Sequence, residues 1–122
     1  MLREPPLIAV VDDDEPIRKA LSRLLRAWEF SVESFSSGRA FLDSLRDRHP
    51  DCVVLDLHMP DMNGLQVLRD LRCKGLDMPV IIITAHDEPN VRADCMAMGA
   101  NDYLAKPIDE AVLRQTIAGV IR

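Results

Sequence analysis

Short runs of apolar residues alternate along the chain with longer stretches in which apolar residues recur at helical spacing. Three runs are almost continuously apolar, at residues 7–11, 52–55 and 80–83. Runs of this kind are typical of strands buried on both faces of a parallel sheet. The segment 30–35 is only half apolar and predicts an edge strand, and 102–104 predicts a short last strand.

A helix is expected after each of these strands. Pro16 suits the first turn of the first helix, and Asp14 and Glu15 suit its N-terminus. The apolar stripes expected to face the core are Ile17, Leu21, Leu24, Leu25 and Trp28, then Ala40, Phe41 and Leu45, then Leu65, Leu68 and Leu71, and finally Ile108, Val112 and Ile117. A further helix is predicted from Pro89 to about residue 98. The basic residues of the first helix are predicted to form a solvated face: Arg18, Lys19, Arg23 and Arg26.

Strand and helix therefore alternate five times, which indicates an α/β fold with helices on both faces of a parallel sheet. The three apolar strands belong in the centre and the two weaker strands at the edges. The order 2-1-3-4-5 satisfies both conditions and is the flavodoxin-like doubly wound arrangement. We expect residues 1–122 to form one domain, with a core of about residues 7–121.

Composition narrows the classes of protein to which the chain can belong. Apolar residues make up 48% of it, enough for a sizeable core, and the apolar runs are too short for a membrane span or a secretory signal. A cytoplasmic location is the resulting expectation. The net charge of −5 argues against nucleic-acid binding by this chain itself. Three cysteines and three histidines show no spacing typical of a disulfide framework or a zinc site.

Polar residues gather where the predicted strands end. Ligands of doubly wound sheets bind at the carboxyl ends of the strands, here between strands one and three. The residues expected at these ends are Asp12, Asp13, Asp56, Thr84 and Lys106. Three carboxylates cannot all stay ionised together without a cation, and oxygen ligands favour Mg²⁺. One carboxylate would remain free to attack a phosphoryl group, whose charge the metal and Lys106 would offset.

Four motifs in this order make the chain similar to the response-regulator receiver domains of two-component signalling. They are V-V-D-D-D-E-P (10–16), V-V-L-D-L-H-M-P-D-M-N-G (53–64), I-I-I-T-A (81–85) and Y-L-A-K-P (103–107). The resemblance covers about residues 7–121. The stretch F-S-S-G-R-A-F-L (35–42) resembles receivers of the nitrogen-fixation regulator type, which carry a C-terminal DNA-binding output domain.

The resemblance implies a role for each site residue. Asp56 would be the phosphoacceptor, Asp12 and Asp13 would hold Mg²⁺ with Asp13 as the more direct ligand, and the main-chain carbonyl of His58 would complete the protein's ligands. The residues that would respond to the phosphoryl group are Thr84, Ala85, Tyr103, Lys106 and Pro107, with a cis bond before Pro107 and Tyr103 as an aromatic switch. A register one residue later would make Asp13 and Asp14 the acidic pair.

The resemblance also implies partners: a sensor histidine kinase, an output controlled by the fourth helix, fifth strand and fifth helix, and a homodimer linked to phosphorylation. Such a chain is a signalling module and not an enzyme, although it takes part in its own phosphorylation and dephosphorylation. The alternatives are the receiver of a hybrid kinase or phosphorelay, and a hydrolase that forms an aspartyl phosphate. The hydrolase generally needs a second acid two residues after the nucleophile, where this chain has His58.

Overall fold

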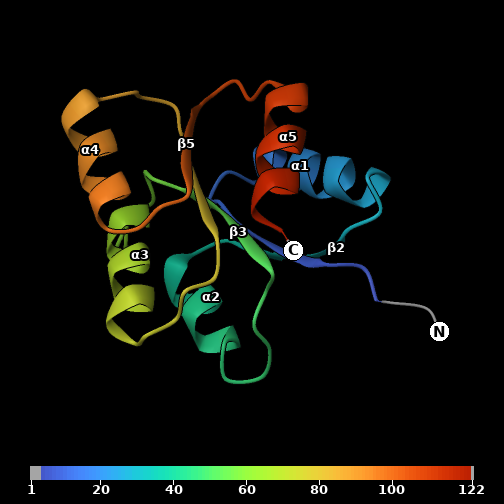
Figure 1. Ribbon diagram of the computed structural model, residues 1–122, viewed down its shortest axis with the longest axis horizontal. Helices are drawn as coiled ribbons and strands as arrows, with labels where there is room; N and C mark the ends of the chain where they lie inside the picture. The colour runs from blue at the N-terminus through green and yellow to red at the C-terminus, as the bar shows by residue number, and fades with distance from the viewer. Residues whose placement is uncertain (1–3, 122) are drawn as a thin grey trace.

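The computed structural model describes residues 4–121, which form one five-stranded parallel sheet and five helices (Figure 1). The strands are β1 Leu7–Val11, β2 Ser31–Phe35, β3 Cys52–Asp56, β4 Val80–Thr84 and β5 Asp102–Ala105. The helices are α1 Glu15–Ala27, α2 Gly38–Ser44, α3 Gly64–Cys73, α4 Pro89–Ala97 and α5 Glu110–Val120. The strand order β2-β1-β3-β4-β5 confirms the predicted topology.

The sheet separates two apolar layers. Helices α2, α3 and α4 cover one face, with Phe41, Leu68 and Cys95 buried against it. Helices α1 and α5 cover the other face, where Leu25 and Ile117 are fully buried. Successive residues of a strand point to opposite faces, so a strand covered on both sides must be apolar throughout. This is why β1, β3 and β4 have no exposed position, whereas β2 lies at an edge and is only partly buried.

Local signals decide where the helices begin. The side chain of Asp14 caps α1 by accepting a hydrogen bond from the backbone N–H of Ile17. Asn63 and Gln66 form a capping box at the start of α3. Helix α4 starts at Pro89 without any side-chain cap, and Cys95 is its one fully buried residue. Helix α4 is therefore the least anchored of the five helices.

Two predicted core positions are wrong. Ala40 of α2 is exposed; Phe41 is buried as predicted, and Leu42 is buried beside it. Val112 of α5 is 42% exposed, because the inward stripe of that helix runs through Leu113 and Ile117, four residues apart. Both errors are shifts of one residue around a helix. Within residues 4–121, no helix is long and apolar enough to cross a bilayer.

Candidate functional site

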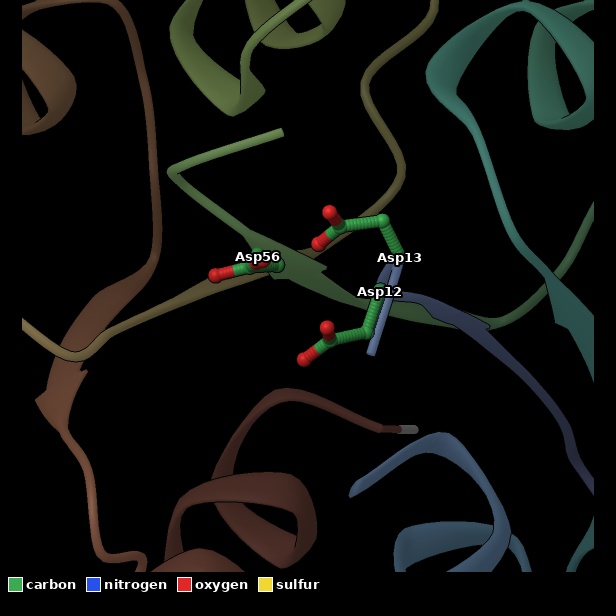
Figure 2. A group of neighbouring side chains, drawn as sticks. All are labelled: Asp12, Asp13 and Asp56. Atoms are coloured by element: carbon green, nitrogen blue, oxygen red, sulfur yellow. The ribbon is translucent and has the colours of Figure 1, made fainter. Parts of the chain in front are cut away.

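Three carboxylates meet at the carboxyl ends of the two central strands β1 and β3 (Figure 2). Asp12 and Asp13 follow β1 directly, and Asp56 is the last residue of β3. One oxygen from each carboxylate lies within 4.8 Å of the others. Asp12 and Asp56 are buried and Asp13 is exposed, so the group opens to solvent on the Asp13 side. The structure thus brings together the three acids that the sequence placed at the switch point.

Lys106 is the cation that contacts the carboxylates of this site. Its Nζ lies 3.0 Å from Asp12 Oδ2 and 3.3 Å from Asp56 Oδ1. The lysine follows β5, and its backbone N–H donates to the carbonyl of Thr84 at 2.7 Å, which anchors the loop beside the sheet. The side chain reaches two acids from distant parts of the chain. This contact explains why a lysine with only 14% of its side chain exposed is tolerated here.

The charges of the site do not balance. Burial and the neighbouring Asp12 carboxylate raise the pKa of Asp56 from 3.8 to about 6, although Lys106 acts in the opposite direction. Burial alone would lower the pKa of Lys106, but its contacts with Asp12 and Asp56 outweigh burial and raise it. Three carboxylates and one ammonium leave a formal charge of −2. A hard divalent cation with oxygen ligands fits both that charge and this donor set.

The four oxygens of the acidic pair differ in what they already bind. Asp12 Oδ1 accepts the backbone N–H of Asp14 at 2.9 Å, and Asp12 Oδ2 accepts Lys106. The carboxylate of Asp13 lies exposed beside them. Asp14 is occupied as the cap of α1 and does not belong to the cluster. The geometry therefore favours Asp12 and Asp13, and not Asp13 and Asp14, as the acidic pair.

Arg18 is a site residue that sequence reasoning missed. It was predicted to lie on the solvated face of α1, yet it is half-buried and its Nη1 donates to the backbone carbonyl of Asp12 at 2.7 Å. That contact holds the turn that presents the acidic pair. The helical pattern alone could not show it, because the acceptor is a backbone atom outside the helix.

Thr84 ends β4 next to Asp56 in the sheet, where Asp56 is in register with Ile83. Its side chain is fully buried, and its hydroxyl exchanges two hydrogen bonds with the backbone of His86, at 3.0 and 3.1 Å. The hydroxyl therefore points into its own loop and not at the carboxylate. Ala85, the next residue, is exposed and has only a methyl side chain.

The loop after β3 is packed directly onto the backbone of Asp56. The N–H of Gly64 donates to the carbonyl of Leu57 at 2.9 Å. A Cβ at Gly64 would lie 2.6 Å from the carbonyl oxygen of Asp56 and 2.9 Å from the Cα of Leu57. The chain needs glycine here because no side chain fits at this approach. The imidazole of His58, in the same loop, is exposed.

Tyr103 and Pro107 lie on the β5 side of the site. Tyr103 is only 2% exposed and packs in the layer that also contains Cys95 of α4. Its hydroxyl has no hydrogen-bond partner among the described residues. The Lys106–Pro107 peptide bond is cis, as expected.

Comparison with known proteins gives a consistent result. The family described as "Response regulator receiver domain" matches residues 8–118. The "Response regulator MprA" of Mycolicibacterium vanbaalenii is 45% identical over 103 residues, which is 84% of this chain and 45% of that protein. The "Transcriptional regulatory protein FixJ" of Azorhizobium caulinodans is 36% identical over 106 residues, 87% of this chain and 50% of that protein. The chain spans about half the length of these relatives.

Solved structures agree with the sequence relatives. The chemotaxis protein CheY4 of Vibrio cholerae has the same fold, with a TM-score of 0.89, 26% identity and coverage of 96% of this chain and 99% of that one. The family match covers nearly the whole of the sheet and its helices, including all five residues at the strand ends. The chain belongs to the response-regulator receiver domains of two-component signalling.

Proposed function

We propose that this chain is a single receiver domain, residues 1–122, whose Asp56 accepts a phosphoryl group from a sensor histidine kinase. The observation that carries the proposal is the environment of Asp56. Its carboxylate ends a central strand, is buried beside Asp12, and contacts one ammonium at 3.3 Å. A carboxylate at the carboxyl end of a central strand, beside other charged groups, can act as a nucleophile toward phosphorus.

Mg²⁺ is the cofactor that the donor set supports. Asp13 and Asp56, with the main-chain carbonyl of His58, would ligate the ion directly. Asp12, beside Lys106, would complete the acidic pair that holds it. Bound Mg²⁺ would supply charge neutralisation for the phosphoryl oxygens. The formal charge of −2 and the exposed position of Asp13 support this assignment.

Asp56, Lys106 and Ala85 would each have a separate role in the transfer of the phosphoryl group. A carboxylate oxygen of Asp56 forms a bond to phosphorus while the phosphorus–nitrogen bond of the donor phosphohistidine breaks, and the leaving imidazole takes up a proton. Lys106 moves from the carboxylate toward a phosphoryl oxygen and offsets its charge. Ala85 leaves the space for that oxygen open.

Phosphorylation would act as an electrostatic switch, since it adds about −1.5 to −2 charges and three acceptor oxygens. Thr84 would exchange its hydrogen bonds with His86 for one to the phosphoryl group, and this would move the loop that leads into α4. Helix α4, strand β5 and helix α5 would form the output surface. The weak anchoring of α4 supports a two-state element there, and the two large apolar side chains that the described residues expose, Met96 and Val112, lie on α4 and α5.

The output is proposed from the relatives. FixJ is named a transcriptional regulatory protein and is about twice as long as the matched segment. By analogy, this domain would control a C-terminal DNA-binding domain outside the chain, and phosphorylation would favour a homodimer through α4, β5 and α5. The domain itself would bind no nucleic acid and no membrane. It would be a signalling module working in the cytoplasm and not a turnover enzyme.

The test is phosphorylation by an acyl-phosphate donor, followed by the intact mass of the protein. We expect one phosphoryl group on the wild type with Mg²⁺, and none after chelation or in Asp56→Asn. Asp61→Asn is the matched control, because Asp61 is exposed in the same loop and has a positive φ of 67° that asparagine adopts readily. Normal labelling of Asp56→Asn would overturn the assignment.

A further inference from the structure

Two histidines that are distant in sequence lie side by side just beyond the carboxyl ends of β3 and β4. His58 belongs to the loop after β3, and His86 belongs to the loop after β4. Their ring centroids are 5.7 Å apart with an angle of 68° between the planes, and both residues are exposed. Their sequence spacing does not resemble a metal-binding motif, so only the folded chain reveals the pair.

Both loops are held by backbone contacts on either side of the pair. The N–H of Leu57 donates to the carbonyl of Ile83 at 2.9 Å, which continues the β3–β4 ladder up to the residue before His58. The backbone of His86 is held by the Thr84 hydroxyl. The two imidazoles therefore start from fixed Cα positions, which lowers the entropy lost when both bind one ligand.

The separation of the rings suits chelation of one metal ion. Metal–nitrogen distances of about 2.0–2.1 Å place two imidazole ring centres on a tetrahedral ion about 5 Å apart. The observed 5.7 Å is close to that value, so rotation of the exposed side chains brings a nitrogen of each ring to a common point without moving the loops. Solvent above the rings leaves the other coordination positions open to water.

We propose that His58 and His86 form a binding site for a divalent transition-metal ion such as Zn²⁺ or Ni²⁺, separate from the carboxylate cluster. Imidazole nitrogens favour these ions, whereas the oxygens of Asp12, Asp13 and Asp56 favour a hard cation. A bound ion ties the loop after β3 to the loop after β4. The binding step does not depend on the proposed phosphorylation of Asp56. Its consequence does: a tied His86 keeps the Thr84 hydroxyl in its present hydrogen bonds.

The test is a calorimetric titration of the untagged protein with Ni²⁺ in saturating Mg²⁺, which occupies the carboxylate cluster first. We expect one ion per chain in the wild type. His58→Gln and His86→Gln should each weaken binding by about 100-fold, because a linked second contact adds about that factor. His49→Gln is the control: His49 is the third histidine, is exposed, and lies at the opposite end of β3. It should bind as the wild type does.

Two results would overturn the site. One is wild-type affinity in His58→Gln or His86→Gln, which would leave the two rings as an aromatic contact only. The other is binding that is lost in Asp13→Asn but kept in both histidine variants, which would assign the ion to the carboxylates. Histidine side-chain NMR with Zn²⁺ provides a second readout, with shifts expected at His58 and His86 and none at His49. Asp56→Asn, which removes phosphorylation, should keep Ni²⁺ binding, so the two proposals fail independently.

Discussion

The guanidinium of Arg92 lies over the ring of Tyr103, 5.4 Å from its centroid. Arg92 belongs to α4 and is exposed, whereas Tyr103 belongs to β5 and is buried. The contact therefore couples the position of the least anchored helix to the rotamer of the aromatic side chain. A cation over an aromatic face at an exposed site contributes about 0.5–1 kcal/mol.

Replacing Arg92 with alanine should release Tyr103 from its inward rotamer. Loss of the contact should lower the ratio of inward to outward rings by about two- to fivefold, the factor that corresponds to this energy. Tyr103 is the one tyrosine of the chain, so fluorotyrosine labelling gives a single ¹⁹F resonance. We expect it to shift toward the solvent-exposed position in Arg92→Ala. Arg114→Ala is the control, because it removes a similar contact between Arg114 of α5 and the ring of Trp28 at the end of α1. An unchanged resonance in Arg92→Ala would show that packing alone orients the ring.

Asp56→Asn should stabilise the protein at neutral pH in the absence of Mg²⁺. The pKa of Asp56 is raised on folding from 3.8 to about 6, so the folded state binds the proton more tightly than the unfolded state. Stability therefore falls as the pH rises from about 4 to 6, by up to about 3 kcal/mol for this group. The neutral amide avoids that loss.

Urea denaturation at pH 7.5 and pH 4.5 measures this effect. The variant should be more stable by about 1–3 kcal/mol at the higher pH, and the difference should shrink at the lower pH, where the wild-type carboxyl is protonated. Asp43→Asn, at an exposed position of α2, should show no such difference. A stability gain for Asp56→Asn that is independent of pH would contradict the charge argument.

Gly64→Ala should destabilise the fold, because the new Cβ would meet backbone atoms of Asp56 and Leu57 that cannot rotate away. We expect a loss of about 2 kcal/mol or more in the free energy of unfolding. Gly119→Ala is the opposite case: beyond its chain neighbours and the backbone of its own helix, no atom lies within 4 Å of its Cβ position, and alanine should add about 0.5–1 kcal/mol in a helix. Thermal unfolding of the pair checks both signs, and equal effects would mean that the loop after β3 adapts.

Lys106→Gln should bind Mg²⁺ more tightly than the wild type. The ammonium at 3.0 and 3.3 Å from two carboxylates competes with the metal for the same negative charge, and glutamine removes it. We expect about a tenfold gain in affinity by calorimetry. Lys74→Gln, which removes an exposed contact with Asp70 at the end of α3, should change nothing. Weaker binding in Lys106→Gln would show that Lys106 orders the carboxylates for the ion.

The fold was predictable because three strands are covered on both faces. Continuous apolar runs at β1, β3 and β4 identify central strands, and the polar pattern of β2 identifies an edge. Together with the common doubly wound arrangement, these assignments predict the observed order. Two individual core positions were predicted wrongly. Ala40 and Val112 were assigned one residue away from the true inward stripe, since helical periodicity in a short segment tolerates such a rotation.

The candidate site was predictable as far as it depends on strand ends. Carboxyl ends of parallel strands meet at one edge of a sheet, so Asp12, Asp13, Asp56 and Thr84 had to lie near one another. Contacts that a side chain makes with backbone outside its own helix or strand left no pattern in the sequence. Arg18 on the carbonyl of Asp12 is one example, and the Thr84 hydroxyl on the backbone of His86 is another.

By itself, the sequence determined the fold, the family and the set of polar residues at the strand ends, because the apolar periodicity and the four motifs are local patterns along the chain. Only the tertiary structure decided that Asp13, and not Asp14, belongs to the carboxylate cluster with Asp12 and Asp56, that Arg92 covers Tyr103, and that His58 meets His86. These relationships depend on the direction of side chains from separate elements. That direction is set by packing across the sheet, which no local pattern encodes.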